Sequence, residues 1–560
     1  LRRLIQVARS RCTASGRRID HSEDVRYDHV MNRLSEMYPL CRSLLGIKLW
    51  QRIAGSHDKE PDSFPDFLQH QGGPGIPPFL SGLAHIELSR HRAAAVVAPT
   101  PATDALILNC TLQVISVAWK NLGQLFQRAK QRDLDRVCPG NEIILTWLRP
   151  SDGTVVTQAA EQADLLAIKL VVEEIDSSDA AREAGVAVGV IDEAIRGAVW
   201  KGLIVSPPSK LRREQAIAEL APRDEFAAAE VFTLQWHLTQ ECDLHCRHCY
   251  DRSRRMAFPY ERALTLLDEL HAFCRRRFVR GQVSLSGGNP LLYPDFIDLY
   301  RAAAERGFMI AILGNATDPG TIEQLIDIRM PVYYQVSLEG LEQQNDEIRG
   351  AGNYRRTVDF LRMLTEMGVP NMVMLTLTRN NMEQVLPLAR ELEGVTGGLT
   401  FNRLALFGEG ASLELPSPEE YMAFLELFAA SLDSHPVLKL KDSLLNTIFE
   451  RDGCCLFGGC AGYGCGAAFN FVSILSDGEV HACRKFPSPI GNILTQSLEE
   501  VYTSASAGRY RSGSSACSGC SLNAVCRGCP AITASFGLDP FTEKDPFCFH
   551  HMTLDRNRLF

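Results

Sequence analysis

Three cysteines lie close together near the middle of the chain, in the run CDLHCRHCY at residues 242–250. The spacing C-x3-C-x2-C allows Cys242, Cys246 and Cys249 to hold three irons of one [4Fe–4S] cube and leaves the fourth iron open to a ligand. Residues 231–240 just before them are apolar and rich in β-forming side chains, so the cysteines are predicted to follow a strand directly. A zinc site or chance clustering is the alternative. Zinc usually takes paired ligands from two separated knuckles, which this triplet alone does not supply.

Most of the other cysteines are grouped as well. The chain has 18 cysteines in 560 residues, and most of those outside the triplet lie between Cys454 and Cys548. A disulfide-stabilised secreted protein is normally short and has cysteines spread through its length. Grouped thiols in a long chain therefore indicate metal ligands, and they predict a reducing, cytoplasmic compartment and an oxygen-sensitive protein.

Length and composition set further limits on the fold and the partners. A chain of 560 residues exceeds one hydrophobic core, so several domains are expected. The net charge of −9 gives no reason to expect nucleic acid or an anionic membrane as a partner. No apolar run is long enough to span a bilayer. Residues 1–18 are basic but lack the apolar core and cleavage site of a signal peptide, so a disordered tail is expected there.

The N-terminal part of the chain divides into two predicted regions. Residues 1–135 are expected to form a mostly helical extension, and residues 136–212 a small winged-helix element of one hairpin and three helices. The hairpin is predicted from Glu142–Leu148 and Thr154–Gln158. DNA binding is disfavoured because the last helix carries acidic residues instead of a dense basic surface.

The central part of the chain alternates between strand-like and helix-like segments. Residues 213–230 are predicted to be a linker or bridging helix. Residues 231–410 contain six βα units, which predict a parallel sheet closed partly into a barrel. The fold class is thus α/β, a partial (β/α)6 TIM-like barrel. Chemistry in such barrels lies at the carboxyl ends of the strands, where the cysteine triplet falls. Residues 411–453 are predicted to be a helical bridge to a cysteine-rich domain at 454–560.

A strand followed by C-x3-C-x2-C and an aromatic residue, Tyr250, resembles the radical SAM superfamily. Ser286 to Pro290 (SGGNP) resembles that family's Gly-Gly-Glu-Pro motif, although Asn289 keeps a hydrogen-bond acceptor without the charge of the acidic residue. Ser337 to Gly340 (SLEG) resembles the family's Ser-Leu-Asp-Gly segment, and Arg349 could pair bidentately with the carboxylate of S-adenosylmethionine (SAM). The resemblance implies one SAM-binding [4Fe–4S] cluster and SAM contacts from Tyr250, Gly287, Gly288, Asn289, Asn315, Ser337, Glu339 and Arg349.

The C-terminal cysteines resemble the SPASM domain of radical SAM peptide maturases. Twelve residues separate Cys465 from Gly478, and four more separate Gly478 from Cys483. A C-x2-C-x5-C-x2-C run follows, with x2 where the family usually has x3. The resemblance implies two auxiliary [4Fe–4S] clusters, the first held by Cys460, Cys465, Cys483 and Cys529 and the second by Cys517, Cys520, Cys526 and Cys548. Two zinc knuckles are the alternative, since four cysteines per site permit them too.

Cys454 and Cys455 are adjacent and lie just before this pattern. They are candidate catalytic residues, as an alternate ligand, a proton or hydrogen-atom donor, or a thiol that engages substrate. An ordinary buried cysteine is the other interpretation.

The winged-helix element resembles the PqqD-like precursor-recognition element found beside enzymes that modify ribosomal peptides, where an edge strand captures a leader peptide. Together these resemblances imply a maturase that cleaves SAM reductively to a 5′-deoxyadenosyl radical and oxidises a precursor peptide. The whole layout most resembles thio(seleno)oxazole-modification maturases, which implies a cysteine- or selenocysteine-containing precursor and a flavodoxin- or ferredoxin-type electron donor. The alternatives are a thioether-crosslinking, sulfatase-type or quinohaem-protein maturase, a non-catalytic peptide-binding iron–sulfur scaffold, and a DNA-binding iron–sulfur regulator.

Overall fold

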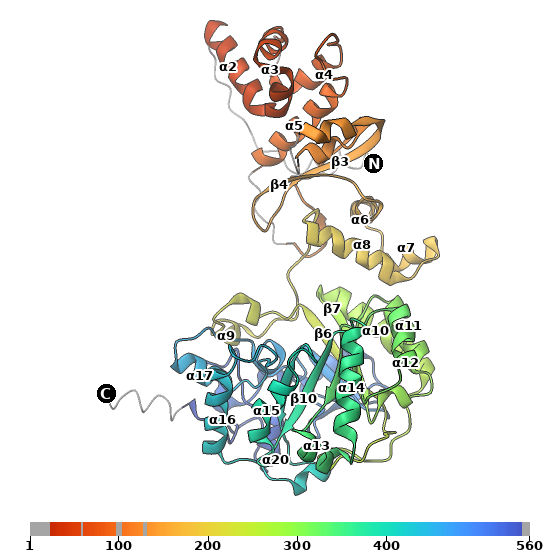
Figure 1. Ribbon diagram of the computed structural model, residues 1–560, viewed down its shortest axis with the longest axis vertical. Helices are drawn as coiled ribbons and strands as arrows, with labels where there is room; N and C mark the ends of the chain where they lie inside the picture. The colour runs from red at the N-terminus through yellow and green to blue at the C-terminus, as the bar shows by residue number, and fades with distance from the viewer. Residues whose placement is uncertain (1–22, 58–59, 97–102, 127–130, 551–560) are drawn as a thin grey trace, which may run out of the picture. The chain divides into compact units, whose positions relative to one another are not determined.

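The computed structural model describes residues 23–57, 60–96, 103–126 and 131–550. The chain divides into two compact units, and the boundary between them in the sequence falls between Pro208 and Ser209 (Figure 1). Within the described ranges, no helix combines the length and the hydropathy that crossing a bilayer requires.

The described part of unit 1 begins with four helices, of which α5 packs on a three-stranded antiparallel sheet. The helices are α2 (Glu23–Met37), α3 (Pro39–Ala54), α4 (Phe64–Leu68) and α5 (Leu80–Ala95). The strands, in sheet order, are β2 (Gln113–Lys120), β3 (Cys138–Leu148) and β4 (Val155–Ala159). Apolar side chains of α5, such as Leu83 and Ile86, share one buried core with Val117 and Ile144 of the sheet.

The predicted hairpin and three helices are present in unit 1. The hairpin is formed by β3 and β4, and the helices are α6 (Gln162–Val172), α7 (Ser177–Ala184) and α8 (Val188–Lys201). The predicted start of this element at residue 136 is wrong, because β2 comes from the part assigned to the helical extension and pairs with β3. A strand whose partner lies beyond an intervening loop carries no local sign of that pairing.

Unit 2 contains the six parallel strands predicted for the barrel. They lie in the order β11-β10-β9-β8-β7-β6. Their bounds are β6 (Val231–Thr239), β7 (Arg280–Gly287), β8 (Met309–Leu313), β9 (Tyr333–Ser337), β10 (Asn371–Leu377) and β11 (Leu399–Arg403). The predicted α/β fold is therefore confirmed.

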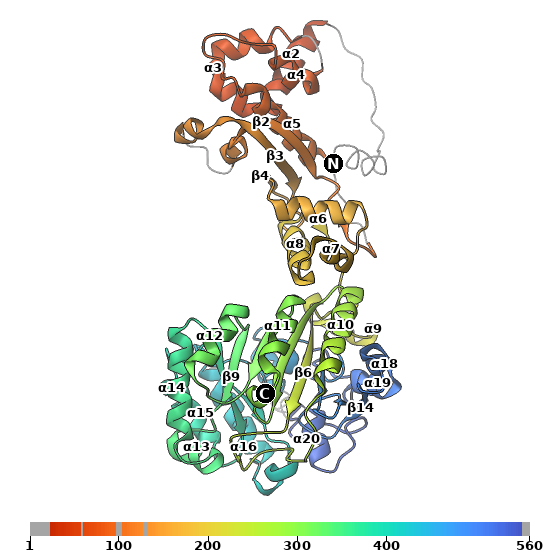
Figure 2. The ribbon, with the colours of Figure 1, turned by 90° about the vertical axis from the view of Figure 1, so that its right-hand side faces the viewer.

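Helices connect these strands and lie around them (Figure 2). They are α10 (Tyr260–Arg277), α11 (Phe296–Glu305), α12 (Pro319–Ile328), α13 (Glu342–Arg349), α14 (Asn353–Glu366) and α15 (Val385–Glu391). Local signals fix where some of them begin: Asp318 accepts a hydrogen bond from the backbone N–H of Thr321, and Pro319 occupies the first turn of α12. The strands and helices bury one continuous apolar core.

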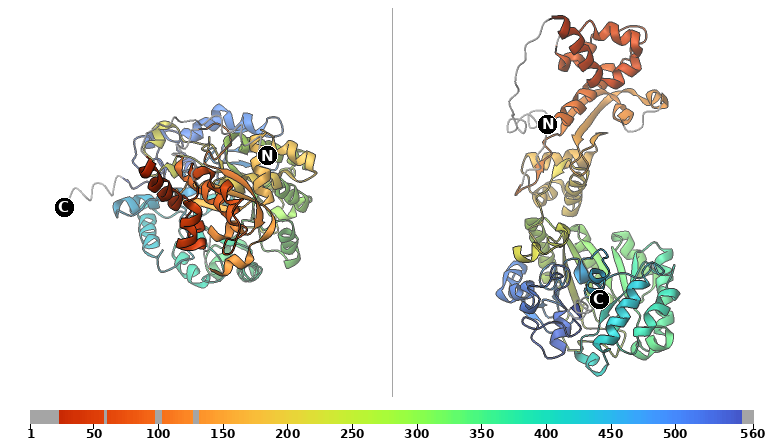
Figure 3. Two further views of the ribbon diagram at one scale, coloured as in Figure 1. Left: turned by 90° about the horizontal axis from the view of Figure 1, so that it is seen from above. Right: turned by 90° about the vertical axis from the view of Figure 1, so that its left-hand side faces the viewer.

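The C-terminal region extends the same sheet. Strand β12 (Phe471–Ile474) pairs in parallel with β6, and β13 (Glu479–His481) and β14 (Pro489–Asn492) follow in antiparallel order. Figure 3 shows the C-terminal residues, in blue, beside the green strands of the barrel. The cysteine-rich region is thus paired, through β12, with β6, the strand that precedes the cysteine triplet.

Residues 213–230, predicted to be a linker or bridging helix, pack against the rest of unit 2. Phe226 and Ala229 are buried in the core of unit 2. The Arg213 guanidinium lies 3.7 Å from the ring centroid of Phe469 and donates to the carbonyl oxygens of Tyr463 at 2.7 Å and Cys465 at 2.6 Å. The predicted helical bridge contains α16 (Pro418–Ala430) and α17 (Leu445–Arg451).

Candidate active site and cysteine groups

A cavity of about 460 Å³ opens at the carboxyl ends of the parallel strands, where barrel enzymes place their chemistry. Its volume falls in the usual range for small-molecule sites. We call it the reaction cavity. Cys242, Cys246 and Cys249 all line it, as do the predicted residues Tyr250, Gly287, Gly288, Asn315, Ser337 and Arg349.

The Gly-Gly turn after β7 lets the backbone approach the cysteine loop closely. The N–H of Gly288 donates to the carbonyl of Thr239 at 2.9 Å, and the N–H of Asn289 donates to that of Glu241 at 2.7 Å. A Cβ atom at Gly288 would clash with the carbonyl oxygen of Glu241. The sequence predicted that these glycines let a ligand approach; in the structure they also fix the position of the loop that carries the cysteines.

Nitrogen donors point at two of the three thiols. Asn315 Nδ2 lies 3.8 Å from Cys242 Sγ, and Arg349 Nη1 lies 3.7 Å from Cys246 Sγ. Burial raises the pKa of the Cys246 and Cys249 thiols, so a metal that binds them must displace their protons. Hydrogen-bond donors stabilise the thiolate form that binds iron. The triplet therefore fits an iron–sulfur cluster.

Glu339 does not face the reaction cavity, contrary to the sequence-based expectation. Its side chain is 1% exposed, and its Oε1 accepts from Arg349 Nε at 2.9 Å and Nη2 at 2.6 Å. Its Oε2 accepts from the backbone N–H of Thr376 at 2.8 Å. The carboxylate is thereby saturated by the protein, and it fixes the guanidinium that reaches Cys246.

Asn289 is also turned away from the reaction cavity. Its Nδ2 donates to Asp243 Oδ1 at 3.0 Å, and Asn315 Nδ2 donates to the same oxygen at 2.6 Å. In this arrangement Asn289 positions a carboxylate within the cysteine loop. The motif identified this position as a candidate SAM contact, whereas in the structure its side chain contacts the cysteine loop.

Several residues of the reaction cavity were not predicted from the sequence. His237 lies on β6, and its Nδ1 is 3.1 Å from the Tyr250 hydroxyl. Burial lowers the pKa of His237 to about 3, so the imidazole is neutral at physiological pH. Its place near the carboxyl end of β6, just before the cysteine loop, was the available signal. Arg484 and Lys485 reach the cavity from the C-terminal region.

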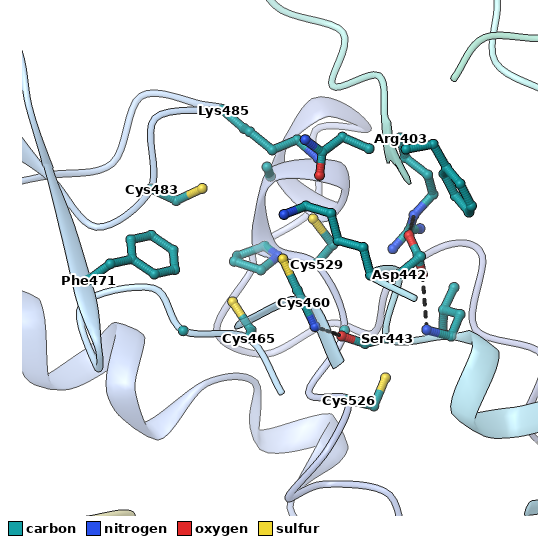
Figure 4. Close-up of a pocket in the computed structure, with 18 residues that line it drawn as sticks. Arg403, Asp442, Ser443, Cys460, Cys465, Phe471, Cys483, Lys485, Cys526 and Cys529 are labelled. Atoms are coloured by element: carbon teal, nitrogen blue, oxygen red, sulfur yellow. Dashed lines mark hydrogen bonds and ion pairs between the residues drawn. The ribbon is translucent and has the colours of Figure 1, made fainter. Parts of the chain in front are cut away.

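A second cavity contains the first group of C-terminal cysteines. Cys460, Cys465, Cys483 and Cys529 all line it (Figure 4). Burial, with the neighbouring thiols, raises the pKa of Cys465 to about 12 and that of Cys483 to about 11. Four thiols around one cavity fit a cluster that carries them as thiolates.

Cys517, Cys520, Cys526 and Cys548 form the second group. Burial raises the pKa of Cys517 to about 11, with smaller contributions from Cys548 and Cys520. Cys526 is electrostatically close to Cys548 and also lines the second cavity, so the two groups adjoin there. No three Cys, His, Asp or Glu side chains converge on a single ion in the parts of the chain that the structure describes.

Cys454 and Cys455 lie outside both cavities, and this placement argues against the predicted catalytic role. Both are exposed. They follow the end of α17, where the N–H of Cys454 donates to the carbonyl of Phe449 at 2.8 Å and the chain turns towards solvent.

Two family models match the two parts of unit 2. The Radical SAM superfamily matches residues 236–392, and the SPASM iron–sulfur cluster-binding domain matches residues 465–530. Unit 2 therefore contains a radical SAM domain and a SPASM domain, and these domains imply SAM and iron–sulfur clusters as cofactors.

Three relatives align over about half of the chain or more. The AdoMet-dependent heme synthase of Methanosarcina barkeri is 25% identical over 57% of this chain and 96% of its own length. The mycofactocin maturase MftC of Mycobacterium ulcerans is 28% identical over 60% of this chain and 92% of its own length. The antilisterial bacteriocin subtilosin biosynthesis protein AlbA of Bacillus subtilis is 23% identical over 48% of this chain and 59% of its own length.

Solved structures also resemble this fold. Streptococcus suis SuiB bound to its precursor peptide SuiA has a TM-score of 0.48 and 17% identity, covering 72% of this chain and 96% of that one. The structure of anSMEcpe with bound AdoMet has a TM-score of 0.47 and 16% identity, covering 59% of this chain and 97% of that one.

Proposed function

We propose that this enzyme is a maturase that oxidatively modifies a cysteine-containing ribosomal precursor peptide. The observation that carries the proposal is that one cavity is lined by the cysteine triplet, by the strand ends of the barrel and by Arg484 and Lys485 of the SPASM domain. A bacteriocin biosynthesis protein and mycofactocin maturases among the relatives support a peptide substrate. Formation of a thio(seleno)oxazole is the specific reaction that we propose.

Three [4Fe–4S] clusters would be held by the cysteines described above. The triplet would hold the SAM-binding cluster, and the two C-terminal groups would hold the auxiliary clusters. The chemistry that these cofactors supply when bound is reductive cleavage of SAM to a 5′-deoxyadenosyl radical, with electrons from a flavodoxin- or ferredoxin-type donor.

The protein's own side chains would orient the reactants and exclude water. Arg349, held by Glu339, fixes a positive charge beside Cys246. Neutral His237 and the Tyr250 hydroxyl form a hydrogen-bonded pair in the wall of the cavity. His237 is buried and Tyr250 is half-buried, so this wall shields part of the space where the substrate would lie from solvent.

Iron content tests this proposal. Anaerobically prepared wild type is expected to hold about twelve irons, and the triple variant Cys242→Ala/Cys246→Ala/Cys249→Ala about eight. The triple variant should also lose 5′-deoxyadenosine formation, because the SAM-binding cluster is absent. Iron, sulfide and 5′-deoxyadenosine are measured on the same preparations, with and without candidate peptides.

The matched control is the double variant Cys454→Ala/Cys455→Ala, whose thiols are exposed and outside both cavities. It should keep all of its iron. Zinc in the C-terminal groups, or unchanged iron in the triple variant, would contradict the three-cluster assignment. Wild type that cleaves no SAM would be a non-catalytic scaffold, and cleavage stimulated by a tetrapyrrole and by no peptide would favour the activity of the heme synthase relatives.

In this proposal the winged-helix element binds the leader of the precursor peptide. Strand β4 is the last strand of its sheet, so its outer edge can accept a peptide strand. Lys201, at the end of α8, donates to Glu161 at 2.7 Å and to Asp164 at 2.8 Å, just after β4. The adjacent Trp200 is 87% exposed. Tryptophan is enriched among binding hot spots, so Trp200 is a candidate contact for the leader.

The substitution Trp200→Ala is expected to weaken binding of a leader-containing peptide by at least tenfold, because truncating a hot-spot tryptophan costs about 2 kcal/mol or more. Binding of a peptide that the enzyme modifies is measured by titration calorimetry with the full chain. Ile47→Ala, at a 70% exposed residue of α3 in the same unit, is the control and should change binding little. Equal effects of the two substitutions would contradict leader binding at this edge.

A further inference from the structure

The basic side chains of the reaction cavity differ in how their charges are neutralised. Arg349 is paired with Glu339, and Arg403 is paired with Asp442 and Asp545. Each of these guanidinium groups is already committed to buried carboxylates.

Arg252, in the same lining, is held by the cysteine loop itself. It donates to His245 Nδ1 at 2.8 Å and to the carbonyl oxygen of Cys246 at 2.8 Å, and it lies 3.8 Å from Glu409. Its contacts are therefore with groups of the protein that surround the cysteine triplet.

Arg484 and Lys485 have no such carboxylate partner within the described residues. The hydrogen bond of the Arg484 side chain goes to a neutral group, from Nη1 to Ser286 Oγ at 3.3 Å. The acidic residues of the lining are Glu241 and Asp251, and Asp251 is 3.5 Å from Arg255. The cavity wall contributed by the SPASM domain therefore has an excess of positive charge.

The two cations have different surroundings. Lys485 lines both the reaction cavity and the cavity of the first cysteine group, where Figure 4 shows it beside Cys483. Arg484 lines the reaction cavity and not the second cavity, and His237 and Tyr250 line the same space. Arg484 is thus the cation that faces the space in which a substrate would lie.

We propose that Arg484, assisted by Lys485, recognises a carboxylate of the substrate in the reaction cavity. This inference deepens the proposed function and rests on it for the peptide nature of the substrate. A guanidinium binds a carboxylate with two parallel hydrogen bonds, and a partly buried cavity strengthens them. The group recognised is the side chain of an aspartate or glutamate, or the C-terminal carboxylate of a peptide.

Three acetylated pentapeptide probes test this site on the SAM-loaded holoenzyme at low ionic strength. The first, Ac-Gly-Ala-Glu-Ala-Gly-amide, has a side-chain carboxylate. The second has Gln in place of Glu, and the third has Gln and a free C-terminal carboxylate. Anaerobic titration calorimetry measures the three dissociation constants. We expect one of the carboxylate peptides to bind about tenfold more tightly than the neutral one, as one charge-assisted pair provides.

Substitution of the proposed residue identifies the group responsible. Arg484→Gln is expected to abolish the tenfold preference, and Arg484→Lys to retain part of it. Arg254→Gln is the control, because Arg254 is exposed in the same region of unit 2 and does not line the cavity. This control should keep the full preference.

Equal binding of the three peptides by wild type would overturn the carboxylate site. So would an Arg484→Gln variant that loses affinity for SAM but keeps the peptide preference, because the carboxylate recognised would then belong to SAM. Formation of 5′-deoxyadenosine by wild type is measured separately. Its absence would count against the proposed function, whereas an Arg484-dependent preference would still support the carboxylate site.

Discussion

Replacing Arg403 with methionine is expected to lower the free energy of unfolding by about 3–5 kcal/mol, since removing one partner leaves buried charges unpaired. Arg403 ends β11, and its side chain is 5% exposed. Its Nε donates to Asp442 at 2.8 Å, and its Nη1 and Nη2 donate to Asp545 at 2.9 and 2.7 Å. Both aspartates are buried, so neither can be compensated by water.

The same substitution is expected to reduce the iron content of the C-terminal cysteine groups. Asp545 accepts a hydrogen bond from the backbone N–H of Cys529 at 3.0 Å, and its carbonyl oxygen accepts from the N–H of Cys548 at 2.8 Å. These cysteines belong to different groups. Arg403 therefore holds the barrel against the loops that carry both sets of thiols.

Anaerobic denaturant unfolding and iron analysis measure these effects. The matched control is Arg451→Met, which removes a surface arginine paired with Asp452 and Glu426. Exposed ion pairs of this kind contribute at most about 1 kcal/mol. If Arg403→Met lost no more stability than this control, or kept all of its auxiliary iron, the proposed linkage would be contradicted.

The sequence predicted the barrel and the cysteine triplet because their signals are local. Strands β6 to β11 alternate with helices, and the run at 242–250 directly follows the first of these strands. A parallel sheet and a site at its carboxyl edge follow from that order alone.

Contacts between distant segments could not be predicted in this way. The pairing of β12 with β6 joins Phe471 to Thr233, and the approach of Arg484 to Ser286 depends on that pairing. The sequence motifs likewise identified Asn289 and Glu339 as candidate site residues, but they did not show which side chains these residues contact. In the structure Asn289 forms a hydrogen bond with Asp243, and Glu339 forms two with Arg349. Both side chains are therefore paired within the protein.

Arg349→Met is expected to destabilise the barrel end of unit 2 by about 3–5 kcal/mol and to release iron from the cysteine triplet. The substitution leaves the Glu339 carboxylate buried without its cation and removes the donor that lies 3.7 Å from Cys246 Sγ. Thermal and denaturant unfolding measure the loss of stability, while iron analysis and SAM binding measure the state of the site.

The double variant Arg349→Met/Glu339→Gln separates the two roles of Arg349. A neutral amide can keep a hydrogen bond to the N–H of Thr376, and no charge remains buried, so we expect most of the lost stability to return. Iron and SAM binding should stay low, because the donor to Cys246 is still missing. A double variant that recovered SAM binding would show that the guanidinium acts only as a counter-charge for Glu339. One as unstable as the single variant would contradict the assignment of the cost to an unpaired buried carboxylate.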